Sequence, residues 1–159
     1  MKENNLVYIS CQEDNNNPIW LEKVEPFVHQ VLTKLEKKLW DLSIVFCQDP
    51  FIKDLNYQYR KIDAPTDVLS FEAGNTYTDE YGIERFLAGD IVISIDTLFR
   101  NADEFNVAVD EELKRLLIHG ILHLSGMDHS DNSPEQEMLK LQESILTDLL
   151  KETDIIIKD

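Results

Sequence analysis

The first third of the chain has a pattern of hydrophobic and polar residues that predicts two strands with a helix between them. Leu6–Cys11 and Leu42–Gln48 are short apolar stretches of the kind found in strands. Between them, apolar residues recur at helical spacing from Ile19 to Leu39, which predicts one long helix. The charged run Lys34–Lys38 is then expected to form the solvated face of that helix.

The middle of the chain predicts a second helix and two further strands. Proline suits the first turn of a helix, so a helix is expected from Asp49 to about Arg60. Val68–Phe71 and Gly89–Ser94 follow as strands, and the second is rich in β-branched residues, as in a buried strand. The polar segment Gly74–Tyr81 between them is expected to be a hairpin loop.

The last third of the chain predicts three helices. The first runs from Asp96 to Phe105, and the last begins at Ser133–Glu135, around a proline, and runs to about Lys151. Asp110 fits the N-cap position of the middle helix. Apolar residues cover most of the circumference of this middle helix, which predicts that it is buried on several sides: Leu113, Leu116, Leu117, Ile118, Ile121, Leu122 and Leu124.

This order of elements, β-α-β-α-β-β-α-α-α, predicts an α+β protein in which a small mixed four-stranded sheet packs with about five helices. A length of 159 residues is that of one domain, so residues 1–159 are expected to form a single domain. No apolar run approaches the roughly 20 residues that span a bilayer, and the N-terminus has no signal-peptide core. We therefore expect a cytoplasmic protein with no membrane partner. Cys11 and Cys47 are expected to be reduced core thiols.

The formal net charge of −16 works against direct binding of a polyanion, which normally draws on a basic surface. A local positive groove can still exist on an acidic protein, because the field near a site depends on where the charges lie. Arg60, Lys61, Arg85 and Arg100 are the candidates for such a patch. The charge weakens a nucleic-acid hypothesis without excluding it.

The segment His119-Gly-Ile-Leu-His123-Leu-Ser-Gly126-Met-Asp-His129 contains three of the four histidines. Residues four apart on a helix differ by roughly 40° of rotation, so His119 and His123 project from one face and can bind one Zn²⁺. Gly126 tolerates the positive φ that turns the chain after a helix, so that His129 can return as a third ligand. Three protein ligands leave a tetrahedral ion one open position for water, as in catalytic sites. The alternative is a chance cluster of helix and surface histidines, which the agreement of spacing and turn glycine disfavours.

The same segment departs from the zinc-protease signature directly after its first histidine. That signature has a glutamate there as general base, whereas this chain has Gly120. The spacing is otherwise similar to the long metzincin motif. A peptidase would need a base from elsewhere, so a divergent zinc peptidase is kept only as an alternative. The fourth histidine, His29, is expected to be an exposed or half-buried helix residue.

Three segments together carry a resemblance to a known family. They are Leu55–Arg60 with Asp63–Phe71, then Gly89–Ser94, then the histidine segment. In order and approximate spacing they resemble the YbeY family, metal-dependent endoribonucleases of bacteria that act in ribosomal RNA maturation. The resemblance covers close to half of the chain, and the histidine segment fits without departure.

This resemblance implies one zinc ion held by His119, His123 and His129, in a zincin-like site on the buried helix, with Arg60 and His119 as catalytic residues. It implies cleavage of single-stranded RNA, with roles in forming the 3′ end of the small-subunit rRNA and in ribosome quality control. Ribosomal proteins or an assembly GTPase are implied as further partners, which would add the affinity that an acidic chain lacks.

The chemistry of phosphodiester cleavage suggests roles for these residues. Extra negative charge develops on the phosphoryl oxygens, where a metal ion and a guanidinium can stabilise it, so we assign Arg60 to the phosphate. The alternative for Arg60 is a surface residue at a helix C-terminus. Asp128 either orients a ligand imidazole or caps a turn. Asp67, Ser70 and Asp90 are expected to be strand-end hydrogen-bonding residues.

No residue stands out as general base, and the nucleophile is either water or the 2′-hydroxyl of the RNA. Three imidazoles also accept nickel, copper or cobalt. The main hypothesis is a zinc-dependent endoribonuclease; the second is a metal-stabilised RNA-binding ribosome assembly factor without significant catalysis.

Overall fold

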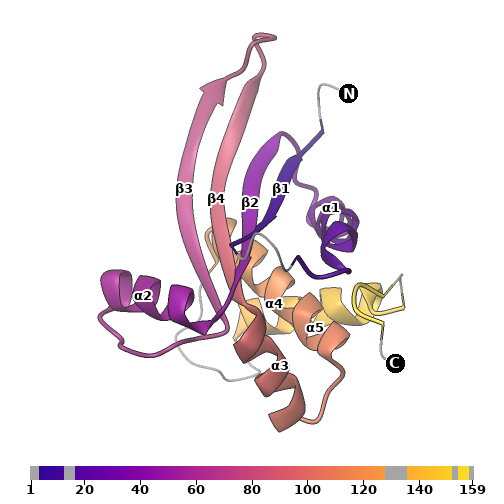
Figure 1. Cartoon of the computed structure of the whole chain (residues 1–159). Coiled ribbons are helices and arrows are strands. Elements are labelled where there is room, and N and C mark those ends of the chain that lie inside the picture. The colour runs from indigo at the N-terminus through magenta and orange to yellow at the C-terminus, as the bar shows by residue number, and fades with distance from the viewer. Residues whose placement is uncertain (1–3, 13–16, 128–135, 152–153, 158–159) are drawn as a thin grey trace.

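Four strands form one mixed sheet in the computed structural model, which describes residues 4–12, 17–127, 136–151 and 154–157. The strands are β1 (Leu6–Cys11), β2 (Trp40–Cys47), β3 (Val68–Thr78) and β4 (Glu84–Ser94). They lie in the order β1-β2-β4-β3, with β1, β2 and β4 parallel and β3 antiparallel to β4 (Figure 1). This confirms the predicted small mixed sheet.

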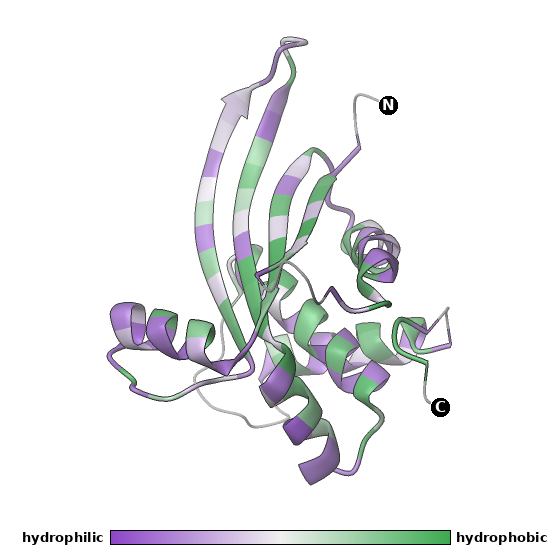
Figure 2. Cartoon of the chain, viewed as in Figure 1, coloured by the Kyte–Doolittle hydropathy of each residue, from purple (hydrophilic) through white to green (hydrophobic). Residues whose placement is uncertain are grey.

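Five α-helices lie in the described part of the chain, and the first follows a short 3₁₀ turn, η1 (Leu21–Lys23). They are α1 (Val24–Lys34), α2 (Asp49–Arg60), α3 (Ile95–Glu104), α4 (Val109–Leu124) and α5 (Glu137–Leu149). Helix α4 is central, because it packs on strands β3 and β4 and also contacts α1, α3 and α5. Its ribbon is accordingly hydrophobic along much of its length (Figure 2). The predicted α+β fold, with the histidines on a buried helix, is confirmed.

The two faces of the sheet carry two separate apolar clusters. Successive residues of a strand point to opposite faces. In β4, Ile91 and Ile93 belong to the main core beneath α1 and α4, whereas Val92 packs with Ile52 of α2 in a smaller cluster. Helix α2 therefore covers the face opposite α4, and it stands apart from the other helices in Figure 1.

A carboxylate at the start of α2 ties this helix to α3. Asp49 accepts hydrogen bonds from Ser94, Thr97 and Arg100 at 2.6, 2.7 and 2.7 Å. Burial alone would raise the pKa of Asp49, but these hydrogen bonds outweigh it and lower the pKa below its ordinary value of 3.8. The position of α2 thus depends on an ionised carboxylate as well as on the smaller apolar cluster.

The predicted helix Ile19–Leu39 is too long at both ends, because the α-helix spans only Val24–Lys34. It ends in a Schellman motif, in which the N–H of Lys37 donates to the carbonyl of Leu32 and that of Glu36 to the carbonyl of Thr33. Glu36 has a φ of 58°, a conformation usually taken by glycine, so the sequence carried no stop signal. Most of the charged run 34–38 therefore lies in a turn beyond the helix.

The predicted loop Gly74–Tyr81 is wrong, since most of it belongs to strand β3. Strand β3 continues to Thr78 and β4 begins at Glu84, so that the connection is a tight turn. Asp79 holds this turn by accepting hydrogen bonds from the N–H groups of Tyr81 and Ile83. The outer half of β3 is exposed, and the hairpin extends beyond the other strands (Figure 1). Polar residues therefore suit it although it is a strand.

Asp110 is not the N-cap of α4, because the helix begins one residue earlier and Ala108 occupies that position. The carboxylate of Asp110 instead accepts hydrogen bonds from the backbone N–H groups of Ile155 and Ile156, and it pairs with the fully buried Lys114 at 2.9 Å. The predicted start of the last helix at Ser133–Glu135 lies outside the described residues.

The cysteines agree with expectation. Both are free, Cys47 is buried, and Cys11 is half-buried. Burial is the main cause that raises the pKa of Cys47 to about 12, so its thiol stays protonated at neutral pH.

Candidate metal centre

A cleft of about 990 Å³ is lined by the first residues of β3, by helices α4 and α5, and by the end of α2. It brings together Arg60, His119 and His123, which lie up to 63 positions apart in the sequence. Helix α4 contributes the two histidines, which are half-buried on its open side while the rest of the helix is packed in the core. The predicted site residues within the described chain therefore converge on one place.

The two histidines present their Nε2 atoms to each other. These atoms are 3.1 Å apart, and the ring centroids are 4.6 Å apart with an interplanar angle of 73°. A tetrahedral zinc ion with Zn–N bonds of about 2.0–2.1 Å separates two ligand nitrogens by about 3.3–3.4 Å. The pair thus has nearly the spacing that one zinc ion requires, and its donor chemistry fits the ion.

The chain after His123 turns as predicted. Gly126 has a φ of 95°, and a second Schellman motif forms, with Met127 donating to the carbonyl of Leu122. His129 and Asp128 lie outside the described residues. Among the residues that the structure describes, no group of three histidine, cysteine, aspartate or glutamate side chains is placed to hold a metal ion. The third ligand therefore stays a prediction.

A network of polar side chains next to the histidines was not anticipated from the sequence. Gln142 of α5 accepts a hydrogen bond from Nδ1 of His119 at 2.7 Å. Arg115 of α4 binds Glu143 of α5 through Nε and a terminal nitrogen, at 3.0 and 3.2 Å. It also binds Glu112 and Glu111 of its own helix, each at 3.0 Å.

One guanidinium, that of Arg115, pairs with three carboxylates in this network. Burial, its largest cause, raises the pKa of Glu112, although the bond with Arg115 acts against it. Burial would also raise the pKa of Glu143, but the bonds with Arg115 and Gln142 lower it overall. Three carboxylates around one guanidinium leave Arg115 engaged. The spacing of Glu111 and Glu112 from Arg115, four and three residues, was the signal that could have revealed part of the network.

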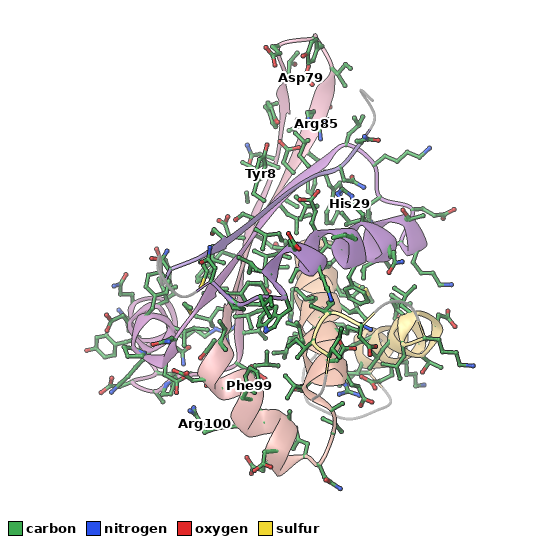
Figure 3. The ribbon with its side chains drawn as sticks, turned by 45° about the vertical axis from the view of Figure 1, so that its right-hand side comes forward. Tyr8, His29, Asp79, Arg85, Phe99 and Arg100 are labelled. Atoms are coloured by element: carbon green, nitrogen blue, oxygen red, sulfur yellow. The ribbon has the colours of Figure 1, made fainter. Side chains whose placement is uncertain are left out.

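Arg60 is placed differently from the other predicted cations. It is the exposed last residue of α2 and lines the cleft. Arg85 is only 4% exposed and donates to Asp41 at 2.8 Å, while Arg100 pairs with Asp49. Arg85 lies on the hairpin and Arg100 on α3, at opposite ends of the molecule (Figure 3). The three arginines therefore do not form a common basic surface, and of the three Arg60 alone lines the cleft.

Of the remaining predicted polar residues, two line the cleft and one lies on the opposite face of the sheet. Asp67 lines the cleft and accepts from its neighbour Val68 N–H and from Asn101. Ser70 also lines the cleft. Asp90 lies on the opposite face of the sheet and accepts a hydrogen bond from Ser43, which agrees with a structural role.

Gly120 explains why the protease glutamate is absent. A Cβ at this position would lie 2.8–3.0 Å from three atoms of Ile91 in β4. The position faces the sheet, not the cleft, so a carboxylate here would be buried in the core. His29, in contrast, is 37% exposed on α1 and lies beside Glu25, as expected for a surface histidine.

The fold and this cleft define a class of small α+β proteins with a histidine pair on a buried central helix. The family model described as Endoribonuclease YbeY matches residues 9–150 of the chain. Curated proteins named Endoribonuclease YbeY are 60% identical in Treponema denticola (89% of this chain, 92% of that protein) and 40% identical in Aquifex aeolicus (82% and 84%). The solution structure of a Thermotoga maritima protein matches 92% of this chain and 91% of its own, with a TM-score of 0.62 and 28% identity.

The chain belongs to the Endoribonuclease YbeY family. The match extends over most of the chain, well beyond the segments that carried the resemblance. No helix among the described residues is long and apolar enough to cross a membrane.

Proposed function

We propose that this protein is a zinc-dependent endoribonuclease that cleaves single-stranded RNA and acts in maturation of the small-subunit rRNA 3′ end and in ribosome quality control. Family membership supports the nuclease activity. The observation that carries the metal dependence is the 3.1 Å approach of the His119 and His123 Nε2 atoms in a cleft that also receives Arg60.

Each residue has a role that follows from its chemistry. His119, His123 and, by prediction, His129 hold the zinc ion. A bound zinc ion supplies charge stabilisation and lowers the pKa of bound water toward about 7. Arg60 binds two non-bridging phosphoryl oxygens in a fork and orients the scissile phosphate. Its exposure at the rim of the cleft lets it reach a strand of RNA before the phosphate is buried.

The proposal extends to partners and location. With a net charge of −16 and few cations at the cleft, the chain gains affinity for rRNA from ribosomal proteins or an assembly GTPase. A role on the ribosome is a role in the cytoplasm. A peptidase is disfavoured because the packing of Gly120 on Ile91 leaves no room for the usual glutamate.

The test combines metal content with cleavage. Purified protein is expected to contain about one zinc per chain by mass spectrometry and to cleave a single-stranded RNA. His119→Ala should lose both zinc and activity. Arg60→Ala should keep zinc but lose about 100-fold or more in cleavage rate, as expected when a group that stabilises developing charge is removed.

Matched controls are available in the chain. Lys53→Ala removes an exposed cation from the same helix as Arg60, and His29→Ala removes a histidine that does not line the cleft. Both should retain zinc and activity. Cleavage that survives His119→Ala and Arg60→Ala would contradict the proposal and leave an RNA-binding assembly factor as the better account.

A further inference from the structure

Gln142 is a buried polar residue that reaches across from α5 to the histidine pair. It is 6% exposed, and its Oε1 lies 2.7 Å from Nδ1 of His119. Its Nε2 donates to Oε2 of Glu143 at 3.1 Å. Both ends of the amide are therefore engaged, as a buried amide requires.

The carboxylate of Glu143 sets the direction of both hydrogen bonds of Gln142. The Glu143 carboxylate binds Arg115 through both of its oxygens, and its lowered pKa keeps it ionised, so it only accepts. Gln142 must then offer Glu143 its NH₂ group. The amide oxygen consequently faces His119, and because that oxygen only accepts, Nδ1 of His119 carries the proton.

From this geometry we infer that Gln142 is a positioning residue, which fixes the tautomer and ring orientation of His119 and is itself fixed by Glu143 and Arg115. With the proton on Nδ1, the lone pair of His119 is on Nε2, the atom that faces His123. The inference rests on the proposed zinc site, because this lone pair is the one a metal ion would use.

The network also couples the placement of two helices to the metal site. Arg115 lies one helical turn before His119 and is anchored to its own helix by Glu111 and Glu112. Its paired contacts with Glu143 hold α5 beside α4, and the neighbouring residue of α5 is Gln142. The acceptor for His119 is therefore held from both helices before any metal binds. Loss of such an outer contact to a ligand histidine typically costs 10–100-fold in metal affinity.

The first test compares wild-type protein with Gln142→Leu, which removes the acceptor but keeps a side chain of similar size. Zinc affinity is measured by competition with a chromophoric chelator at fixed pH. The His119 tautomer of the metal-free protein is read by long-range ¹H–¹⁵N NMR. In the wild type we expect the Nδ1–H tautomer of His119. In Gln142→Leu we expect that this tautomer is no longer the dominant form and that zinc binds about 10–100-fold more weakly than in the wild type.

A rescue variant separates positioning from packing. In the double variant Gln142→Glu with Glu143→Gln, the residue at 142 still accepts from His119. The new amide at 143 can donate to it and accept from Arg115, and the net charge is unchanged. Zinc affinity and tautomer should return to within a few-fold of wild type. Gln142→Glu alone should bind zinc more weakly than the double variant, since it sets two carboxylates side by side.

The outcomes are distinct from those of the proposed function. If Gln142→Leu binds zinc as tightly as the wild type and keeps the same His119 tautomer, the inference is overturned, whether or not the protein cleaves RNA. An Nε2–H tautomer of His119 in the metal-free wild type would overturn it as well, even if Gln142→Leu does not fold. Absence of RNA cleavage with the expected tautomer and zinc affinities would instead contradict the nuclease proposal and leave the positioning role intact.

Discussion

Gly120 packs so closely on Ile91 that even a methyl group would collide. A Cβ at position 120 would lie 2.8 Å from Cδ1, 2.9 Å from Cγ2 and 3.0 Å from Cγ1 of Ile91. Overpacking of this kind costs about 1–3 kcal/mol, whereas alanine in place of glycine within a helix gains about 1 kcal/mol. We therefore expect Gly120→Ala to lower the free energy of unfolding by about 1 kcal/mol.

The collision can be removed from the other side, which makes the reasoning testable. All three close atoms belong to Ile91, so they are absent in Ile91→Ala, which alone should cost about 2–5 kcal/mol as a cavity. In that background Gly120→Ala should become stabilising, because only its helix propensity and the filling of the cavity remain. The sign of the effect is expected to reverse, from about 1 kcal/mol destabilising to about 1 kcal/mol stabilising or more, which is a coupling energy of about 2–3 kcal/mol.

The assay is urea unfolding of the four proteins of this cycle, followed by circular dichroism. Ile93→Ala provides the matched control background: Ile93 is another fully buried isoleucine of β4, and its atoms are not among the three that a Cβ at position 120 would approach most closely. There Gly120→Ala should still destabilise. If Gly120→Ala changes the free energy of unfolding equally in the wild-type and Ile91→Ala backgrounds, to within about 0.5 kcal/mol, the packing argument fails.

Three further predictions concern stability. Arg85→Met should lower the free energy of unfolding by about 3–5 kcal/mol, because the buried carboxylate of Asp41 loses its cationic partner and keeps only the hydroxyl of Tyr77 as a side-chain donor. Asp41→Leu added to it should restore much of the loss, and a loss below about 1 kcal/mol for Arg85→Met in urea unfolding would contradict this. The pKa of Asp49 is lowered from 3.8, so the stabilisation by its carboxylate is complete above that pH and is lost as the pH falls through the folded-state pKa. The difference in unfolding free energy between wild type and Asp49→Asn should therefore shrink on acidification from about pH 5, and it should not shrink on going to about pH 8. Removal of zinc by a chelator should lower the melting temperature, and added zinc should restore it. At a free zinc concentration 100 times the dissociation constant, binding should raise the free energy of unfolding by about 2.7 kcal/mol, whereas the stability of His119→Ala should not respond to zinc.

The order of elements could be predicted because each leaves a pattern in the sequence. Helix α2 was expected at Asp49–Arg60 and lies there, since proline marks its start. The end of α1 was missed because Glu36 adopts the positive φ that normally calls for glycine. The outer half of β3 was missed because a strand exposed on both faces needs no apolar alternation.

The candidate site was predictable to a similar degree. His119 and His123 share a helical face by spacing alone, whereas only the family resemblance singled out Arg60 from the other candidate cations. Gln142 was out of reach, because its contact with His119 depends on how α5 packs on α4 and the two residues are 23 positions apart. Local periodicity carries no information about that contact.

The placement of α2 on the far face of the sheet means that the cleft is assembled from two parts that are held by largely different contacts. The histidines lie on α4, which packs in the main core. Arg60 lies on α2, which is anchored by the small cluster around Ile52, Leu69 and Val92 and by the contacts of Asp49 with α3. If the proposed roles hold, a change in the anchoring of α2 would alter phosphate binding by Arg60 more than metal binding by the histidines. On that proposal, a relative with a loosened α2 would still bind the ion but would bind the scissile phosphate more weakly, which is one physical route from a nuclease to a non-cleaving assembly factor on the same scaffold.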